Sequence, residues 1–166
     1  MPDEIEKKFL IAGGTNVKEL IKPFKTTNIV QAYLEVGDTE RRVRSKGDKY
    51  FYTIKRKKPD SNGLVRGEEE REITESEFKT GLQKHIGNVI NKTRTKIPLA
   101  NDLFAELDIF KDDLDGLVTV EVEFPDEKMV KDFNQPEWFG LDVTSDKRYK
   151  NQTLAIDGLP TKSIDE

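Results

Sequence analysis

Apolar and polar residues alternate with a period of two along most of this 166-residue chain. Successive side chains of a β-strand point to opposite faces, so this alternation predicts strands with one apolar and one polar face. It predicts eight strands, at about residues 3–11, 29–36, 39–46, 49–57, 66–73, 88–96, 103–110 and 117–124. The connections are short and no Gly/Ser- or Pro-rich linker interrupts them, which predicts a single domain over residues 1–166.

Helical spacing is rarer, and it predicts short helices at 15–22, 74–87, 125–134, 146–149 and 151–156. The clearest of these begins at Thr74, with Glu77 three residues later as in a capping box. We expect this helix to run to about Gly87, with Ile86 and Val89 continuing its apolar stripe. Many strands and few helices favour a β-dominated, α+β fold, with the strands antiparallel and forming a barrel.

The polar faces of the strands are charged, and the charges are sorted by sign. Residues of equal parity share a face. Acidic residues share a face on three strands: Glu68, Glu70 and Glu72 on one, Glu106 with Asp108 on another, and Glu121 with Glu123 on a third. On the first strand Glu4 and Glu6 share a face with Lys8. Basic pairs are Arg42 with Arg44 and Lys92 with Arg94, and Lys55 stands alone. Two structures fit: an open sheet with a solvated charged face, or a closed barrel with a charged, ligand-filled lumen.

Composition narrows the chemistry of such a lumen. The chain has no Cys and one His, so it has no thiolate or multi-histidine metal site, and a bound metal must have oxygen ligands. Clustered carboxylates suit Mg²⁺ or Mn²⁺, and clustered Lys and Arg suit phosphates. A net charge of −4 argues against nucleic-acid binding. No apolar run is long enough to span a membrane, and the acidic N-terminus lacks a signal core, so we expect a cytoplasmic location.

The charged strands also carry, in order, motifs of one family. The chain resembles the CYTH family, the triphosphate tunnel metalloenzymes, and most closely its compact bacterial members. The segments that carry the resemblance are Glu4-Ile5-Glu6-Lys7-Lys8-Phe9, Gln31-Ala32-Tyr33-Leu34, Arg42-Val43-Arg44, Tyr52-Thr53-Ile54-Lys55, Arg66-Gly67-Glu68-Glu69-Glu70, Asn91-Lys92-Thr93-Arg94, Glu106-Leu107-Asp108-Ile109-Phe110, Glu121-Val122-Glu123-Phe124, and the stretch from Pro136 to Tyr149.

The resemblance implies an eight-stranded antiparallel closed tunnel barrel with a few flanking helices. It implies a divalent-metal-dependent hydrolase that cleaves a phosphoanhydride bond of a triphosphate, most simply inorganic triphosphate, with Mg²⁺ or Mn²⁺ as cofactor. Implied metal ligands are Glu4, Glu6, Glu121 and Glu123. Implied phosphate-binding residues are Arg42, Arg44, Lys55, Lys92, Arg94, Lys147 and Arg148. Implied catalytic residues are Lys8, near the reacting phosphate, and the acids Glu68, Glu70 and Asp108.

Other functions stay open at this point. The same tunnel motifs serve adenylyl cyclases that convert ATP to cyclic AMP, and thiamine triphosphatase and RNA 5′-triphosphatase are further alternatives. A non-catalytic binder of polyphosphate or nucleotide belongs to a different class. The expected partner is therefore a small phosphorylated substrate, with no membrane and no nucleic acid, while the sequence does not give the oligomeric state. Outside the motifs, Arg56 is expected to face solvent and Thr95 to point away from Arg94.

Overall fold

A single antiparallel sheet dominates the structure, which is a computed structural model describing residues 4–57 and 65–160. The side chains of Glu4, Val65 and Arg66 lie outside the described part. The strands are β1 (Glu4–Ile11), β2 (Thr26–Glu35), β3 (Thr39–Lys46), β4 (Lys49–Lys57), β5 (Val65–Ile73), β6 (Ile86–Pro98), β7 (Phe104–Phe110), β8 (Val118–Phe124) and β9 (Phe139–Asp142). The β-dominated fold predicted from the alternation is therefore present, and each of the eight predicted strands forms.

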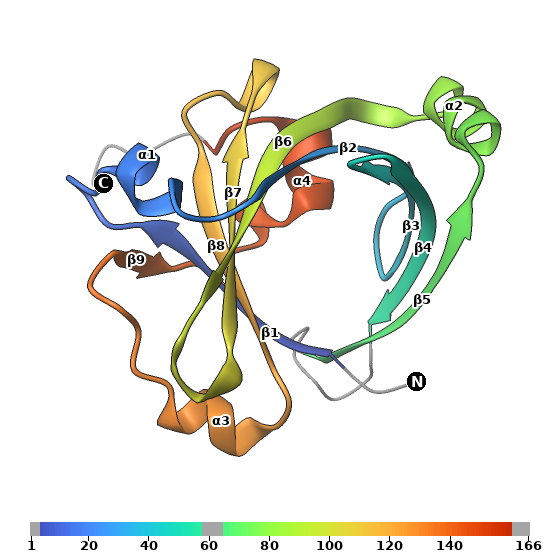
Figure 1. Cartoon of the computed structure of the whole chain (residues 1–166). Helices are drawn as coiled ribbons and strands as arrows, with labels where there is room; N and C mark the ends of the chain where they lie inside the picture. Colours follow the sequence, from blue (N-terminus) through green and yellow to red (C-terminus); the bar gives the residue numbers. More distant parts are fainter. Residues whose placement is uncertain (1–3, 58–64, 161–166) are drawn as a thin grey trace.

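The order of the strands is β5-β4-β3-β2-β6-β7-β8-β1-β9. Figure 1 shows β2 to β5 curving around one side while β1 crosses the molecule and reaches the start of β5. There β1 and β5 pair at Glu4 with Arg66 and at Ile5 with Val65, a much shorter ladder than the one between β1 and β8. The strand count was one too low, because residues 139–142 pair with the far end of β1. That four-residue strand is too short to show a period of two.

Helices cover the apolar outer faces of the curved sheet or fill one end of it. They are α1 (Val17–Ile21), α2 (Glu75–Gln83), α3 (Glu127–Asp132) and α4 (Asn151–Asp157), with 3₁₀ turns η1 (Ala100–Asp102), η2 (Asp112–Leu114) and η3 (Lys147–Tyr149). None of the helices in the described ranges is long and apolar enough to cross a membrane.

Helix α2 starts as predicted and ends earlier. The Thr74 side chain accepts a hydrogen bond from the Glu77 N–H, and the Glu77 carboxylate accepts one from the Thr74 N–H, which completes the capping box. The predicted extension to Gly87 was wrong. Ile86 already pairs with Tyr33 of β2, so the residues after Lys84 gain sheet partners that a longer helix would lack.

Two apolar clusters lie on the outside of the sheet, and a third closes one end. One cluster packs β1, β7 and β8 against α1 and α3, and another packs α2 on β2 and β3. The third joins Tyr33, Ile90 and Phe110 to Leu154 and Ala155 of α4. Gly87 permits the close approach of α4: its φ is 66°, and a Cβ there would lie 2.6 Å from the Ala155 carbonyl oxygen. With apolar faces outside, the charged faces point inward.

Candidate functional site

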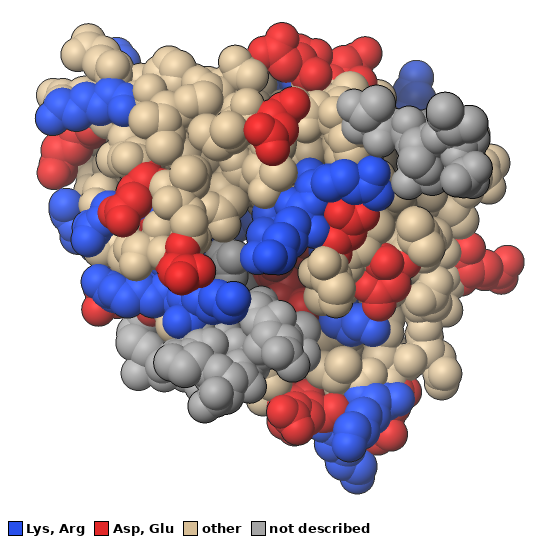
Figure 2. Space-filling model, turned by 180° about the vertical axis from the view of Figure 1, so that it is seen from behind, with Lys and Arg blue, Asp and Glu red and all other residues tan. Residues whose placement is uncertain are grey.

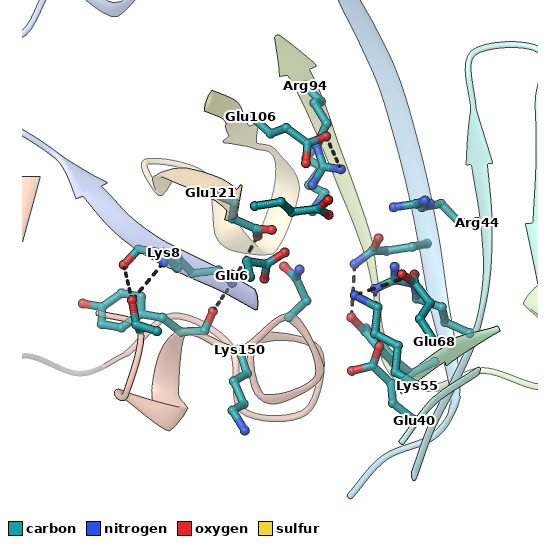
Figure 3. Close-up of a pocket in the computed structure, with 18 of the residues that line it drawn as sticks. Glu6, Lys8, Glu40, Arg44, Lys55, Glu68, Arg94, Glu106, Glu121 and Lys150 are labelled. Carbon is teal, nitrogen blue, oxygen red and sulfur yellow. Dashed lines mark hydrogen bonds and ion pairs between the residues drawn. The ribbon is translucent and has the colours of Figure 1, made fainter. Parts of the chain in front are cut away.

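The charged faces enclose a cavity of about 280 Å³. Figure 2 shows basic and acidic side chains gathered around a hollow on this side of the molecule. Figure 3 shows charged side chains of the sheet facing one another across the cavity, with Lys150 of the C-terminal segment at its edge. Its described lining consists of Glu6, Lys8, Gln31, Tyr33, Glu40, Arg42, Arg44, Lys46, Lys55, Glu68, Glu70, Lys92, Arg94, Glu106, Glu121, Glu123, Val143, Thr144, Asp146, Tyr149, Lys150 and Asn151. The charged rows thus face one another across the cavity and do not form the solvated face of a flat sheet.

The wall formed by β6, β7 and β8 centres on Asp108, which is fully buried. Its two carboxylate oxygens accept hydrogen bonds from Nε and Nη2 of Arg94, at 2.8 and 2.9 Å. The Lys92 ammonium, also fully buried, lies 2.8 Å from the same carboxylate. Cross-strand pairing of Arg94 with Asp108 creates this contact, because directly opposed residues lie on one face. Asp108 therefore holds the Arg94 and Lys92 side chains in place from the side away from the cavity.

Burial and charge shift the pKa values in this wall in opposite directions. Burial lowers the pKa of Lys92 to about 8, although Asp108 opposes the shift. Burial would raise the pKa of Asp108, but the charges of Arg94 and Lys92 hold it below its usual value. Burial would likewise raise the pKa of Glu121, yet Lys8 and Arg94 hold it well below the usual range. Both acids are therefore ionised at neutral pH.

Apart from the buried pair of Arg42 with Glu40, at 3.3 Å, the wall formed by β3, β4 and β5 holds its charges more loosely. The Arg44 guanidinium donates to Glu70 at 3.2 Å, and the Thr53 hydroxyl donates to the same oxygen at 2.8 Å. Lys55 lies 3.9 Å from Glu68. Among the described residues, the buried Nε atoms of Arg42 and Arg44 have no hydrogen-bond partner. Buried donors without partners are costly, so these two N–H groups favour an anionic ligand in the cavity.

Lys8 enters the cavity from β1. Its ammonium donates to the Tyr149 carbonyl at 2.7 Å and lies 3.4 Å from Glu121. Figure 3 shows Lys8, Glu6 and Glu121 converging on one side of the cavity, opposite Arg44 and Lys55. The cavity thus has an acid-rich side built on β1 and β8 and a cationic side built on β3 and β4.

The acid-rich side contains three of the four implied metal ligands. Glu6 on β1 lies directly opposite Glu123 on β8. Glu121 lies two residues before Glu123 on the same strand and also lines the cavity. Like charges in directly opposed positions repel, and a divalent cation with oxygen ligands relieves this repulsion. The side chain of Glu4 lies outside the described residues. Within the described residues, no three acidic or histidine side chains already converge on one point.

The structure brings together most, but not all, of the residues expected at the site. Asp108 lies behind the lining rather than in it. The side chains of Lys147 and Arg148 are exposed, and Arg148 pairs with Asp146. The C-terminal segment instead contributes Asp146, Lys150 and the Tyr149 carbonyl.

Four lining residues on β2 and β3 were absent from the predicted site: Glu40, Lys46, Gln31 and Tyr33. Strand parity contained the signal for all of them. Glu40 and Lys46 share a face with Arg42, and on β2 Gln31 lies directly opposite Arg44 and Tyr33 directly opposite Arg42. Extending each charged row to the ends of its strand would have found them.

The fold encloses a large charged cavity, and comparison with known proteins gives the family of the chain. Two curated inorganic triphosphatases are each 37% identical to the chain: one from Nitrosomonas europaea covers 92% of this chain and 97% of its own length, and one from Acetivibrio thermocellus covers 93% and 94%. A crystal structure of an inorganic triphosphatase matches with a TM-score of 0.66 and 34% identity, over 95% of this chain and 97% of that one. No protein-family model matches the chain.

These similarities extend over nearly the whole chain, and the motif-bearing strands surround one cavity. The chain belongs to the CYTH family of triphosphate tunnel enzymes. The resemblance inferred from the sequence is confirmed, and the names of the relatives agree with the triphosphatase that it implied.

Proposed function

We propose that this chain is a divalent-metal-dependent triphosphatase that hydrolyses inorganic triphosphate inside the charged cavity. The observation that carries the proposal is the pair of buried guanidinium Nε donors, on Arg42 and Arg44, that face an acid-rich side in the same cavity. A chain of phosphates carrying a divalent cation satisfies both sides. The 37% identity to two inorganic triphosphatases supports the same substrate.

Phosphoryl transfer needs mainly positioning and charge neutralisation. In our proposal Arg42, Arg44, Lys55 and Arg94 hold the phosphates, and Lys8 contacts the phosphoryl group that is transferred. Glu6, Glu121 and Glu123, with Glu4, hold Mg²⁺ or Mn²⁺. A divalent metal held by these carboxylates would neutralise charge on the phosphate oxygens. Lys147 and Arg148 would reach substrate only if their exposed side chains turned inward.

Water attack completes the reaction. A water oxygen forms a bond to the terminal phosphorus, the bridging P–O bond breaks, and orthophosphate and pyrophosphate leave. The water loses its proton to a carboxylate. Glu70 is restrained by Thr53 and Arg44, whereas the contact of Glu68 with Lys55 is longer, at 3.9 Å. We assign the orientation of the water to Glu68 for this reason.

The lining also favours an inorganic substrate over a nucleotide. Within the described lining the aromatic residues are Tyr33 and Tyr149, and Tyr33 is fully buried. A nucleobase is commonly bound by stacking on an exposed aromatic ring. We further propose that the chain acts as one domain whose sheet works as a closed tunnel through the short β1–β5 pairing. The cytoplasmic location stays a prediction.

The test is a phosphate-release assay with triphosphate, ATP, thiamine triphosphate and pyrophosphate in the presence of Mg²⁺ or Mn²⁺. We expect metal-dependent release of phosphate from triphosphate, lost on chelation and in Glu6→Gln. Glu69→Gln, which changes the same group on the outer face of β5, serves as the control. Cyclic AMP formed from ATP would support the cyclase alternative, and binding of triphosphate without turnover would support a non-catalytic binder.

A further inference from the structure

The C-terminal segment holds Lys8 by its main chain as well as by its side chain. The pairing of β9 with β1 ends at Asp142, opposite Phe9, after a shift in register. Beyond it, the Val143 N–H donates to the Lys8 carbonyl at 2.9 Å, and the Lys8 N–H donates to the Thr144 hydroxyl oxygen at 3.0 Å. At Lys8, whose side chain enters the cavity, the Thr144 hydroxyl thus takes the place of the backbone carbonyl that would accept the next hydrogen bond between the strands.

The Thr144 hydroxyl is itself fixed. Its oxygen lies 2.6 Å from Oδ1 of Asp142, which also accepts the Thr144 N–H at 2.9 Å. A second, longer contact of 3.3 Å joins the hydroxyl to the Lys8 carbonyl. Oδ2 of Asp142 pairs with Lys7 at 2.9 Å. With its proton directed at Asp142, the hydroxyl presents a lone pair to the Lys8 N–H.

The side chain of Lys8 is directed by the same segment. An ammonium group has three N–H donors. Tyr149, in η3, accepts one of them at 2.7 Å, and Glu121 lies 3.4 Å away on the other side. Within the described structure these two contacts leave one donor for a phosphate oxygen. The aim of that donor depends on where the main chain of β1 sits relative to the Tyr149 carbonyl.

We propose that Thr144 is a positioning residue for Lys8: its hydroxyl fixes the main chain of β1 so that the ammonium, held against Tyr149, points its remaining donor at the reacting phosphate. This inference rests on the proposed function. It also gives the segment around Lys147 and Arg148 a role that does not depend on their exposed charges. The segment acts through a hydroxyl and a backbone carbonyl.

The kinetic test compares Thr144→Val, which has nearly the same shape and no hydroxyl, with Thr144→Ser, which keeps the hydroxyl. With triphosphate and Mg²⁺ we expect Thr144→Val to lower kcat by about 10- to 100-fold, because small misplacements of a catalytic group are costly, while KM changes little. Thr144→Ser should recover most of the lost kcat. Thr80→Val, on the exposed face of α2, is the matched control. Equal kcat for Thr144→Val and the wild-type protein would overturn the inference.

A double-mutant cycle separates positioning from general loss of structure. If Thr144 acts through Lys8, adding Thr144→Val to Lys8→Gln should lower kcat by no more than about twofold further, since coupled residues are not additive. A full additional loss in the Lys8→Gln background would show that Thr144 acts elsewhere, and would sink the inference.

A second measurement does not depend on catalysis. Amide hydrogen exchange at Lys8 should be faster in Thr144→Val than in Thr144→Ser or wild type, because the acceptor of that N–H is gone. Unchanged exchange contradicts the inference even if triphosphate is hydrolysed. An inactive wild-type protein in which exchange responds as expected would contradict the proposed function and leave the link between Thr144 and Lys8 supported.

Discussion

The two walls of the cavity hold similar charges in different ways. On the β6–β7–β8 wall, Asp108 and Lys92 are 0% exposed, and Arg94 makes two hydrogen bonds of 2.8 and 2.9 Å to Asp108. On the β3–β4–β5 wall, Glu70 and Glu68 are 35% and 30% exposed, and their contacts with Arg44 and Lys55 are 3.2 and 3.9 Å. The first wall is assembled around Asp108 before any ligand arrives, with Lys92 held there as an ion pair. Within the described residues, the second wall retains two buried guanidinium Nε donors without hydrogen-bond partners, on Arg42 and Arg44.

The difference separates two uses of buried charge. A charge that is paired inside the protein shapes the site and supports folding, because removing its partner leaves an uncompensated ion in a dry environment. A charge that lacks a full set of partners is available to a ligand. Substitutions in the first wall should therefore be read mainly in stability, and those in the second wall mainly in catalysis.

The largest effect should come from Asp108→Asn. This change leaves Arg94 and Lys92 without their shared counter-charge, and we expect the free energy of unfolding to fall by about 3–5 kcal/mol. Urea denaturation followed by fluorescence of Trp138 measures it. A loss below about 1 kcal/mol would mean that the β6–β7–β8 wall is not the preassembled one.

Arg44→Lys should show the opposite balance. It keeps the positive charge and removes the planar fork, so a phosphate loses charge-assisted hydrogen bonds. We expect kcat/KM for triphosphate to fall by about 10- to 100-fold, with little change in unfolding free energy. Arg41→Lys is the matched control, since Arg41 neighbours this row and faces outward, bonded to Glu35. If both variants lose activity equally, the effect is not in the cavity.

The pH dependence of the unfolding free energy should reveal the lowered pKa of Lys92. Burial lowers its pKa from 10.5 to about 8 in the folded protein, so between these values the unfolded chain binds more protons. Unfolding free energy should therefore rise with pH in this window, by up to about 1.4 kcal/mol per unit from Lys92. The loss of unfolding free energy caused by burying the charged Lys92 ammonium is fully present below pH 8. In Lys92→Met the slope between pH 8 and 10.5 should be smaller, and parallel curves for the two proteins would refute the assignment.

The smallest effect should come from the outer face of the same strands. Arg56 and Glu69 pair at 3.6 Å with more than half of each side chain exposed. Exposed pairs contribute little, so Glu69→Gln should change the unfolding free energy by less than about 0.5 kcal/mol and leave kcat as it is. A larger loss of stability would show that inward or outward placement does not govern these charges.

The sequence was most informative where strand parity governs. It placed Arg42, Arg44, Lys55, Lys92, Arg94, Glu121 and Glu123 on faces that the structure brings to one cavity, and it placed Arg56 outside. Thr95 does point away from Arg94, and it is buried against Thr26. These residues lie in the middle of strands, where alternation is uninterrupted.

Strand parity predicts nothing for segments that lie outside the regular strand pairing. The C-terminal segment has no period of two, so Lys147 and Arg148 rested on the family resemblance alone, and the backbone carbonyl of Tyr149 has no signature in the sequence. Depth is also invisible to parity. Asp108 and Glu106 share a face, yet Asp108 is covered by Arg94 and Lys92 while Glu106 reaches the cavity.

Gly87 carries a consequence for how this protein can vary. It is exposed and carries no side chain, yet any Cβ at this position would meet the Ala155 carbonyl at 2.6 Å and shift α4 away from β6. Helix α4 brings Asn151 to the cavity and fixes the Gly37 turn through Gln152. In a saturation library selected for activity, we expect this surface position to retain glycine almost alone, while its neighbour Asn88 accepts many residues.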